Sequence, residues 1–254
     1  MNASITYEQP LNEIIRVCLR LERLFEQLDH QRKDMTMLGM HQMIATLINL
    51  LHLLDRPDLK AKLAKELSHH LTALARYSHL PELDKYKYEQ ITNQLNELSS
   101  NFIESSGKIG YRLREIELLN TLRMHLASPG GGCSFDIPIY HYWLKQPKEW
   151  QQATIDNWLH DFKDIRLATG LVLDLVRKNE KIHSKQAIHG FHQELLDPQL
   201  NLRMIRIGVD PQIPTFPEIS VGRHVLSVRF LTPTIEKPPT QYTENFAFEL
   251  SYCT

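Results

Sequence analysis

Apolar residues recur every three or four positions through the first two thirds of the chain. The clearest stretch places seven apolar positions on one face of a helix: Leu11, Ile14, Ile15, Cys18, Leu21, Phe25 and Leu28. This spacing predicts one buried stripe along a helix of roughly 20 residues. Similar spacing predicts further helices at about 36–54, 58–77, 84–104, 109–127, 137–145, 148–160 and 162–178.

Beyond Lys185 the pattern shortens toward a period of two. Apolar and polar side chains alternate in Leu200–Val209, Val225–Leu231 and Phe246–Leu250, as they do in half-buried strands. Prolines between these segments are typical of turns that join antiparallel strands. Ala3–Glu8 also has the pattern of a short strand. We expect it to join the C-terminal sheet, because an isolated strand would leave its backbone groups unpaired.

The order of these elements predicts an α+β chain in which helices come first and strands last. We expect a large N-terminal all-helical domain over residues 9–180. A smaller antiparallel β-domain would combine residues 1–8 with residues 181–254. No internal repeat or low-complexity tract interrupts either part.

Composition narrows the class of protein without naming a function. The 254 residues are 42% hydrophobic and 23% charged, as in globular chains, and the net charge of −1 provides no general attraction to nucleic acid or anionic membranes. Three cysteines scattered along the chain do not form a disulfide framework, which favours a reducing compartment. No stretch reaches the roughly 18 apolar residues of a membrane span, and the first twenty residues do not resemble a signal peptide. We therefore expect a soluble, cytoplasmic protein.

The run Pro129–Pro138 is the most distinctive segment, with three of the ten glycines and one cysteine. Its last three residues, Asp136 to Pro138, predict a cap that leads into a new helix. Cys133 beside a helix start, with His141 as a base, would suit a cysteine-dependent hydrolase or transferase. Eight residues of helix would separate the two side chains by about 10 Å, which argues against direct contact. A small buried cysteine in a tight corner is the simpler interpretation.

Two other kinds of site find little support. The glycine run lacks the Gly-Lys-Ser/Thr ending of a phosphate-binding loop, and no predicted strand precedes it. Thirteen histidines suggest a metal site, but the adjacent pair His69 and His70 would point to different helix faces. His183, His189 and His192 lack the clustered cysteine or carboxylate spacing of metal ligands. We expect these histidines to be surface or capping residues.

The arginines are the stronger candidates for binding. Arg16, Arg20 and Arg23 share one face of the first helix, and nearby Glu13 and Glu26 would offset part of their repulsion. The face is either a solvated surface with ordinary ion pairs or a patch that binds carboxylates through the arginine fork. Neutral net charge and the lack of a recognition element weigh against a nucleic-acid-binding module. Further candidates are Arg112, Arg114 and Arg123 on a later helix and Arg203, Arg206, Arg223 and Arg229 on the strands.

Several short motifs follow one another along the chain. They are Tyr7-Glu8-x-Pro10-Leu11-Asn12-Glu13 with Arg16 and Leu19-Arg20-x-Glu22, the Ser128 to Pro138 run with His141-x-Trp143-Leu144, Val172 to Arg177, Pro217-Glu218-Ile219-Ser220, and Arg229-Phe230. In this order they resemble the ZapD family of bacterial cell-division proteins over essentially the full chain.

The resemblance implies a non-enzymatic, cytoplasmic homodimer that is recruited to the division ring at mid-cell. Such a protein binds the C-terminal tail of FtsZ, a tubulin-like GTPase, and cross-links and bundles FtsZ protofilaments to promote Z-ring assembly and stability. It implies no catalytic residue, cofactor or metal, and no nucleic-acid or membrane partner. The family's helical domain and β-domain agree with the fold predicted from the hydrophobic pattern.

The resemblance also implies that basic residues line a tail-binding pocket between the two domains. Two positions depart from the family pattern, because Val225 and Glu117 stand where relatives carry arginine. Either the pocket is less basic here, or Arg223, Arg203 or Arg114 supplies the missing charge. The tail-binding residues implied or inferred in this way are Arg20, Arg56, His141, Arg223, Arg229, Arg16 and Arg114.

Overall fold

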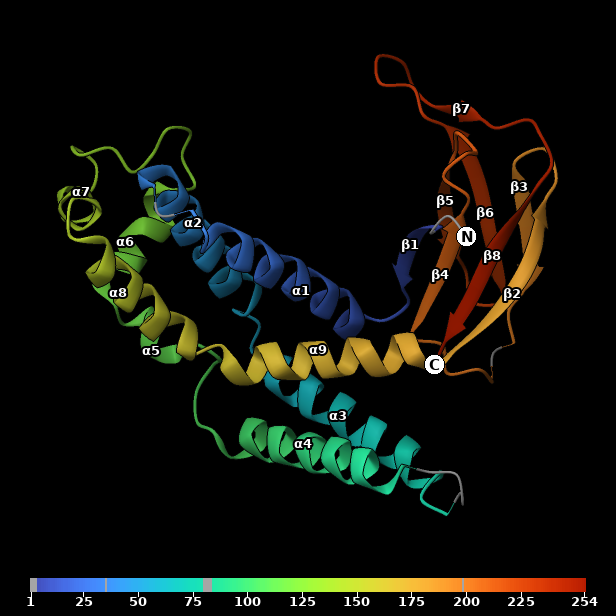
Figure 1. Ribbon diagram of the computed structural model, residues 1–254, viewed down its shortest axis with the longest axis horizontal. Helices are drawn as coiled ribbons and strands as arrows, with labels where there is room; N and C mark the ends of the chain where they lie inside the picture. The colour runs from blue at the N-terminus through green and yellow to red at the C-terminus, as the bar shows by residue number, and fades with distance from the viewer. Residues whose placement is uncertain (1–3, 35, 80–83, 198) are drawn as a thin grey trace. The chain divides into compact units, whose positions relative to one another are not determined.

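The computed structural model describes residues 4–34, 36–79, 84–197 and 199–254, and these form two compact units (Figure 1). The β unit combines Met1–Arg16 with Leu173–Thr254, and the helical unit is Val17–Val172. Helices α1 (Glu13–Gln31) and α9 (Lys163–Lys178) each contain one of the two boundaries. The α+β class predicted from the sequence is confirmed.

The helical unit contains the predicted succession of helices. Between α1 and α9 these are α2 (Met37–Leu53), α3 (Leu59–Ala75), α4 (Lys85–Glu104), α5 (Tyr111–Arg114), α6 (Glu117–His125), α7 (Pro138–Leu144) and α8 (Lys148–His160). The apolar stripe of α1 is buried from Ile14 to Leu28, as its spacing predicts. Side-chain caps fix two of the helix starts: Thr36 accepts a hydrogen bond from the Gly39 amide, and Asp84 accepts one from the Lys87 amide.

The prediction of one helix over residues 109–127 is wrong, because the segment divides into α5 and α6. Ile116 has an extended conformation (φ −76°, ψ 111°), which a continuous helix cannot contain. The side-chain amide of Asn120 donates to the carbonyl of Arg114, which in an unbroken helix would accept the backbone N–H four residues on. This side-chain bond satisfies the end of α5 and lets the chain change direction.

The β unit consists of two antiparallel sheets. Sheet A has the order β1 (Ile5–Pro10), β4 (Met204–Val209), β8 (Phe246–Cys253) and β2 (Glu180–Ala187). Sheet B has the order β3 (Phe191–Leu195), β6 (Val225–Thr232) and β5 (Phe216–Val221), with β7 (Thr240–Gln241) also paired to β6. The N-terminal strand joins sheet A beside β4, as expected, although Ala3 lies outside the described residues.

The core of the β unit lies between these two sheets. It contains Ile205, Ile207 and Val209 of β4, Leu226, Val228 and Phe230 of β6, and Phe246, Phe248 and Leu250 of β8. The ring of Phe230 packs edge-on against Phe246 and Phe248, with centroid separations of 4.8 and 4.9 Å. Each such aromatic pair contributes about 0.5–1.5 kcal/mol beyond the area it buries. The unit is therefore a β-sandwich.

A network of four charged side chains attaches β1 to the rest of the β unit. Glu8 accepts two hydrogen bonds from Arg177 in the last turn of α9, at 2.9 and 2.8 Å. Arg206 of β4 lies 3.2 Å from the same carboxylate and 2.7 Å from Glu180 of β2. Because these side chains are largely buried, the bidentate pairing fixes both the first strand and the end of α9 against sheet A.

Candidate functional site

Two of the predicted binding residues, Arg16 and Arg223, line one pocket of about 540 Å³ in the β unit. Arg16 lies in the first turns of α1, and Arg223 lies in the turn between β5 and β6 rather than on a strand. Leu11, Leu196 and Leu202 contribute apolar surface to the same pocket. The pocket, called here the Arg16–Arg223 pocket, thus combines two guanidinium groups with leucine side chains, and Asp197 and Asn201 also line it. Such a lining suits a short peptide that carries both a carboxylate and an aliphatic side chain.

The two arginines of this pocket differ in how they are paired. Arg16 forms an ion pair with Glu13 at 2.9 Å, and its side chain is 44% exposed. Arg223 is exposed and forms no ion pair with any other residue in the described part of the chain. The backbone amide of Gly222 donates to the carbonyl of Val225 at 2.8 Å, which closes the turn that presents Arg223. Arg223 therefore keeps its donors available to an incoming anion.

On α1 the predicted cationic face is present. Arg20 is exposed and has no ion-pair partner among the described residues, whereas Arg23 lies 3.5 Å from Glu26. The expected pairing with Glu13 and Glu26 is therefore confirmed. Because these pairs are exposed to solvent, each contributes little stability and can exchange its partner.

Arg114 is a largely buried member of the predicted binding residues. Its guanidinium lies 3.2 Å from Asp55 and donates to the carbonyl of Leu51 at 3.0 Å, leaving the side chain 12% exposed. Asp55 also pairs with Lys108 at 2.9 Å and Arg123 at 3.5 Å. The hydrogen bond from Lys108, together with the two arginines, holds the pKa of Asp55 below its usual range although burial opposes ionisation. Arg114 therefore pairs with the Asp55 carboxylate and with a carbonyl group at the C-terminal end of α2, where a positive charge is favourable.

The remaining basic residues lie in both units. Arg56 is half-buried just after α2, and His141 is exposed on α7. Arg229 is exposed on β6 and lies 3.7 Å from Glu218, its cross-strand neighbour on β5. Arg203 precedes β4 rather than lying on a strand, whereas Arg206 lies on β4 as expected and pairs with Glu8 and Glu180.

The two positions at which the resemblance leads us to expect arginine lie in different environments. Val225 is half-buried at the start of β6, and Glu117 is exposed in the first turn of α6. A negative charge at that position suits the partial positive charge of a helix N-terminus. Neither side chain adds positive charge to the surface.

The glycine-rich run contains Cys133 and leads into α7, the helix that bears His141. Cys133 is exposed, which corrects the expectation of a buried thiol, and the thiol donates to the carbonyl of Gly130 at 3.3 Å. Asp136 is not the helix cap, because its carboxylate accepts from the amide of Cys133 and Ile137 occupies the cap position. Pro138 begins α7 as predicted. Within the described contacts no hydrogen bond joins Cys133 to His141, so the cysteine-enzyme alternative is not supported.

Buried aromatic rings hold the helix that bears His141. Tyr140 is fully buried, and its hydroxyl lies 2.9 Å from Nδ1 of His41 on α2. Trp143 stacks on Trp158 of α8 with a centroid separation of 6.1 Å. Since these two anchors face inward, His141 between them faces solvent.

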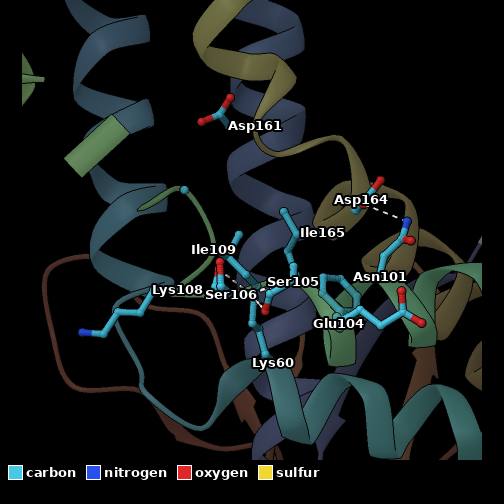
Figure 2. Close-up of a pocket in the computed structure, with 12 residues that line it drawn as sticks. Lys60, Asn101, Glu104, Ser105, Ser106, Lys108, Ile109, Asp161, Asp164 and Ile165 are labelled. Atoms are coloured by element: carbon cyan, nitrogen blue, oxygen red, sulfur yellow. Dashed lines mark hydrogen bonds between the residues drawn. The ribbon is translucent and has the colours of Figure 1, made fainter. Parts of the chain in front are cut away.

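A second pocket, of about 580 Å³, lies within the helical unit and is shown in Figure 2. The ammonium of Lys60 donates to the carbonyl and hydroxyl of Ser105 and to the carbonyl of Ser106, at 3.0, 2.8 and 3.4 Å. Burial lowers the pKa of Lys60. Asn101 donates to Asp164 at 3.1 Å across the same pocket. These bonds join α3 and α9 to the end of α4, so the polar groups here are used to hold helices together.

Three of the histidines considered as metal ligands have structural partners. His189 and His192 lie 3.0 Å from the backbone carbonyls of Thr243 and Gln186, consistent with capping roles. His70 is buried 3.6 Å from Glu66, one turn earlier on α3, so its expected surface position is wrong. Residue 70 follows Leu63 and Leu67 on the inward face of that helix, which explains its burial.

Two kinds of feature are absent from the described residues. No group of three or more histidine, cysteine, aspartate or glutamate side chains among them could hold a metal ion. None of the helices in the described ranges is long and apolar enough to cross a membrane.

The fold and these side chains define a class of protein: an α+β protein with a helical unit, a β-sandwich unit and exposed arginines on each. The family model ZapD, described as a cell division protein, matches residues 19–229. The cell division protein ZapD of Methylococcus capsulatus is 34% identical over 253 residues, which cover 100% of this chain and 99% of that protein. Its counterpart in Coxiella burnetii is 33% identical over 252 residues, 98% of each chain. The chain belongs to the ZapD family of cell division proteins.

Proposed function

We propose that this protein binds the C-terminal tail of FtsZ and, as a homodimer, cross-links and bundles FtsZ protofilaments to promote assembly and stability of the Z-ring. It acts in the cytoplasm at mid-cell and catalyses no reaction. Membership of the ZapD family over the whole chain supports a role in cell division. The observation that carries the binding mode is the Arg16–Arg223 pocket, which brings together two arginines and several leucines, with one carboxylate, Asp197, also in the lining.

The chemistry of the pocket suggests how a tail is recognised. Guanidinium groups bind carboxylates in a planar, two-bond arrangement, and the leucine walls accept aliphatic side chains. The further proposed tail-binding residues are Arg20, Arg56, His141, Arg229 and Arg114. Of these, Arg20, His141 and Arg229 are exposed, whereas Arg114 would first have to release its bonds to Asp55 and Leu51.

Bundling requires several weak contacts between FtsZ tails and the dimer to act together. A disordered tail loses chain entropy when it docks, so a single contact is weak. A two-fold dimer presents two copies of each binding residue, and a filament displays many tails. Rebinding at high local concentration then increases the overall affinity about 10²–10⁴-fold without any new contact.

Co-sedimentation with FtsZ filaments tests this function. The full chain should move FtsZ into the low-speed pellet, and it should fail to do so with FtsZ that lacks its C-terminal tail. Tail-less FtsZ alone, assembled with GTP, controls for filament formation. Bundling of tail-less filaments to the same extent would overturn the proposed mechanism.

A further inference from the structure

One carboxylate in the helical unit is shared by three cationic side chains. Oδ1 of Asp55, just after α2, lies 2.9 Å from the ammonium of Lys108 and 3.2 Å from Nη1 of Arg114. The other carboxylate oxygen, Oδ2, lies 3.5 Å from Nη2 of Arg123 on α6. Three positive charges against one negative charge leave these four side chains, called here the Asp55 cluster, with a net positive charge.

The Asp55 cluster is gathered from four places in the sequence. Asp55 follows the C-terminal end of α2, Lys108 lies between α4 and α5, and Arg114 ends α5. The chain changes direction before α6, and Asn120 fixes this change by its bond to the carbonyl of Arg114. Arg123 of α6 thereby reaches the same carboxylate. Because like charges repel at such short range, a carboxylate between the three cations stabilises their arrangement.

A single carboxylate does not use the full hydrogen-bonding capacity of these cations. Lys108 and Arg123 each pair with Asp55 alone among the described contacts, and at 3.5 Å Arg123 lies beyond the usual length of an N–H···O bond. The side chain of Asp55 is 42% exposed, whereas those of Arg114 and Arg123 are 12% and 19% exposed. The acidic side chain is therefore more accessible to solvent than the two arginines with which it pairs.

We propose that Asp55 is an internal substitute for a ligand carboxylate: it holds the three cations together in the free protein and is replaced by a carboxylate of the bound FtsZ tail. The ligand is the tail of the proposed function, on which this role of Asp55 rests. Exchange of one carboxylate for another keeps the guanidinium of Arg114 paired, so no largely buried charge is left without a partner. The displaced carboxylate of Asp55 turns toward water, which solvates it well.

Asp55 therefore competes with the tail for the same cations. Removal of its charge should strengthen tail binding, which is the opposite of the effect expected for a residue that contacts the tail. Asp55→Asn removes the charge but keeps an oxygen that accepts from Lys108. Asp58→Asn is the matched control, because Asp58 is similarly exposed, at 53%, and pairs at 2.6 Å with Lys62, a residue outside the proposed tail-binding set.

Fluorescence anisotropy with a labelled FtsZ tail peptide measures the affinities of the unsubstituted chain and the two variants. Asp55→Asn should bind the peptide at least about threefold more tightly, and Asp58→Asn should change the affinity less than about 1.5-fold. An Asp55→Asn affinity no higher than that of the unsubstituted chain, or an equal gain in Asp58→Asn, would refute the exchange and leave tail binding intact. Absence of binding by the unsubstituted chain would refute the proposed function and this role of Asp55 together.

A second measurement uses the unsubstituted chain and does not depend on the folding of a variant. The hydrogen bond from Lys108, together with the charges of Arg114 and Arg123, holds the pKa of Asp55 below its usual range although burial opposes ionisation. Carboxyl ¹³C spectra recorded over a range of pH measure this pKa. A saturating tail peptide should raise the pKa of Asp55, because the cations then bind the peptide carboxylate, and should leave that of Asp58 unchanged. An Asp55 pKa that does not respond to the peptide would contradict the exchange.

Discussion

At the scale of single residues, arginines that are equivalent candidates in the sequence differ in whether their guanidinium groups are already paired within the protein. Arg114 is bound to Asp55 and to the carbonyl of Leu51, while Arg223 is exposed without an ion pair among the described contacts. The sequence could name both as basic candidates but could not distinguish them. Their partners are set by contacts between distant segments, which neither periodicity nor motif spacing encodes.

This difference predicts that Arg223→Glu weakens tail binding more than the reversal of another exposed cation. The substitution places a carboxylate where the pocket should bind one, so affinity for an FtsZ tail peptide should fall at least about tenfold. Lys237→Glu, in the exposed loop after β6, makes the same charge change outside the pocket and should alter affinity less than about twofold. Fluorescence anisotropy with a labelled tail peptide measures both. Equal losses in the two variants would indicate a general charge effect instead.

The three cysteines should differ in reactivity. Burial raises the pKa of Cys18 and of Cys253 to about 12, and the thiolate is the reactive form. Cys133 is exposed. A thiol reagent at pH 8 should therefore modify one cysteine per folded chain rapidly and all three after denaturation. Cys133→Ser should abolish the rapid phase, and a rapid phase that survives this substitution would show that a buried thiol is accessible.

At the scale of elements, the hydrophobic pattern predicted every strand that has a neighbouring strand on both sides. Strands β4, β6 and β8 lie inside their sheets, and each was recognised from alternating apolar residues. The edge strands β2, β3 and β5 were not delimited, whereas β1, also an edge, was predicted from Ala3–Glu8. On β2, Lys181 to Ser184 are all exposed, so the period of two that marks a half-buried strand is absent. The helices were easier, because their buried stripes extend over several turns.

The junction that begins α5 provides a prediction at this scale. Gly110 has φ +70°, and a Cβ there would lie 3.1 Å from Leu51 and 3.2 Å from Phe162. Gly130 has nearly the same conformation, φ +72°, but nothing lies within 4 Å of its Cβ position. Gly130→Ala should therefore cost roughly 1–2 kcal/mol of backbone strain, and Gly110→Ala about 1–3 kcal/mol more from overpacking. Urea unfolding measures both, and equal costs would refute the packing contribution.

At the scale of the whole molecule, the proposed binding residues come from both units. Arg16, Arg223 and Arg229 belong to the β unit, and Arg20, Arg56 and His141 belong to the helical unit. The order of the motifs along the chain predicted this set through resemblance to the family. The shared pocket of Arg16 and Arg223 was not predictable, because folding brings together two residues from opposite ends of the sequence.

Salt should weaken bundling by the whole molecule more steeply than it weakens binding of one tail. Ion pairs at exposed arginines are screened as the Debye length falls from about 10 Å at 0.1 M to about 3 Å at 1 M ionic strength. A cross-link requires two tails to be bound at once. Its stability therefore depends on the affinity of both contacts, and salt lowers each of them. Pelleting of FtsZ should therefore fall between about 50 and 500 mM NaCl faster than tail-peptide binding does, with FtsZ alone as the control for filament assembly. Bundling that is insensitive to salt over this range, in a chain whose circular dichroism is unchanged, would contradict recognition led by arginines.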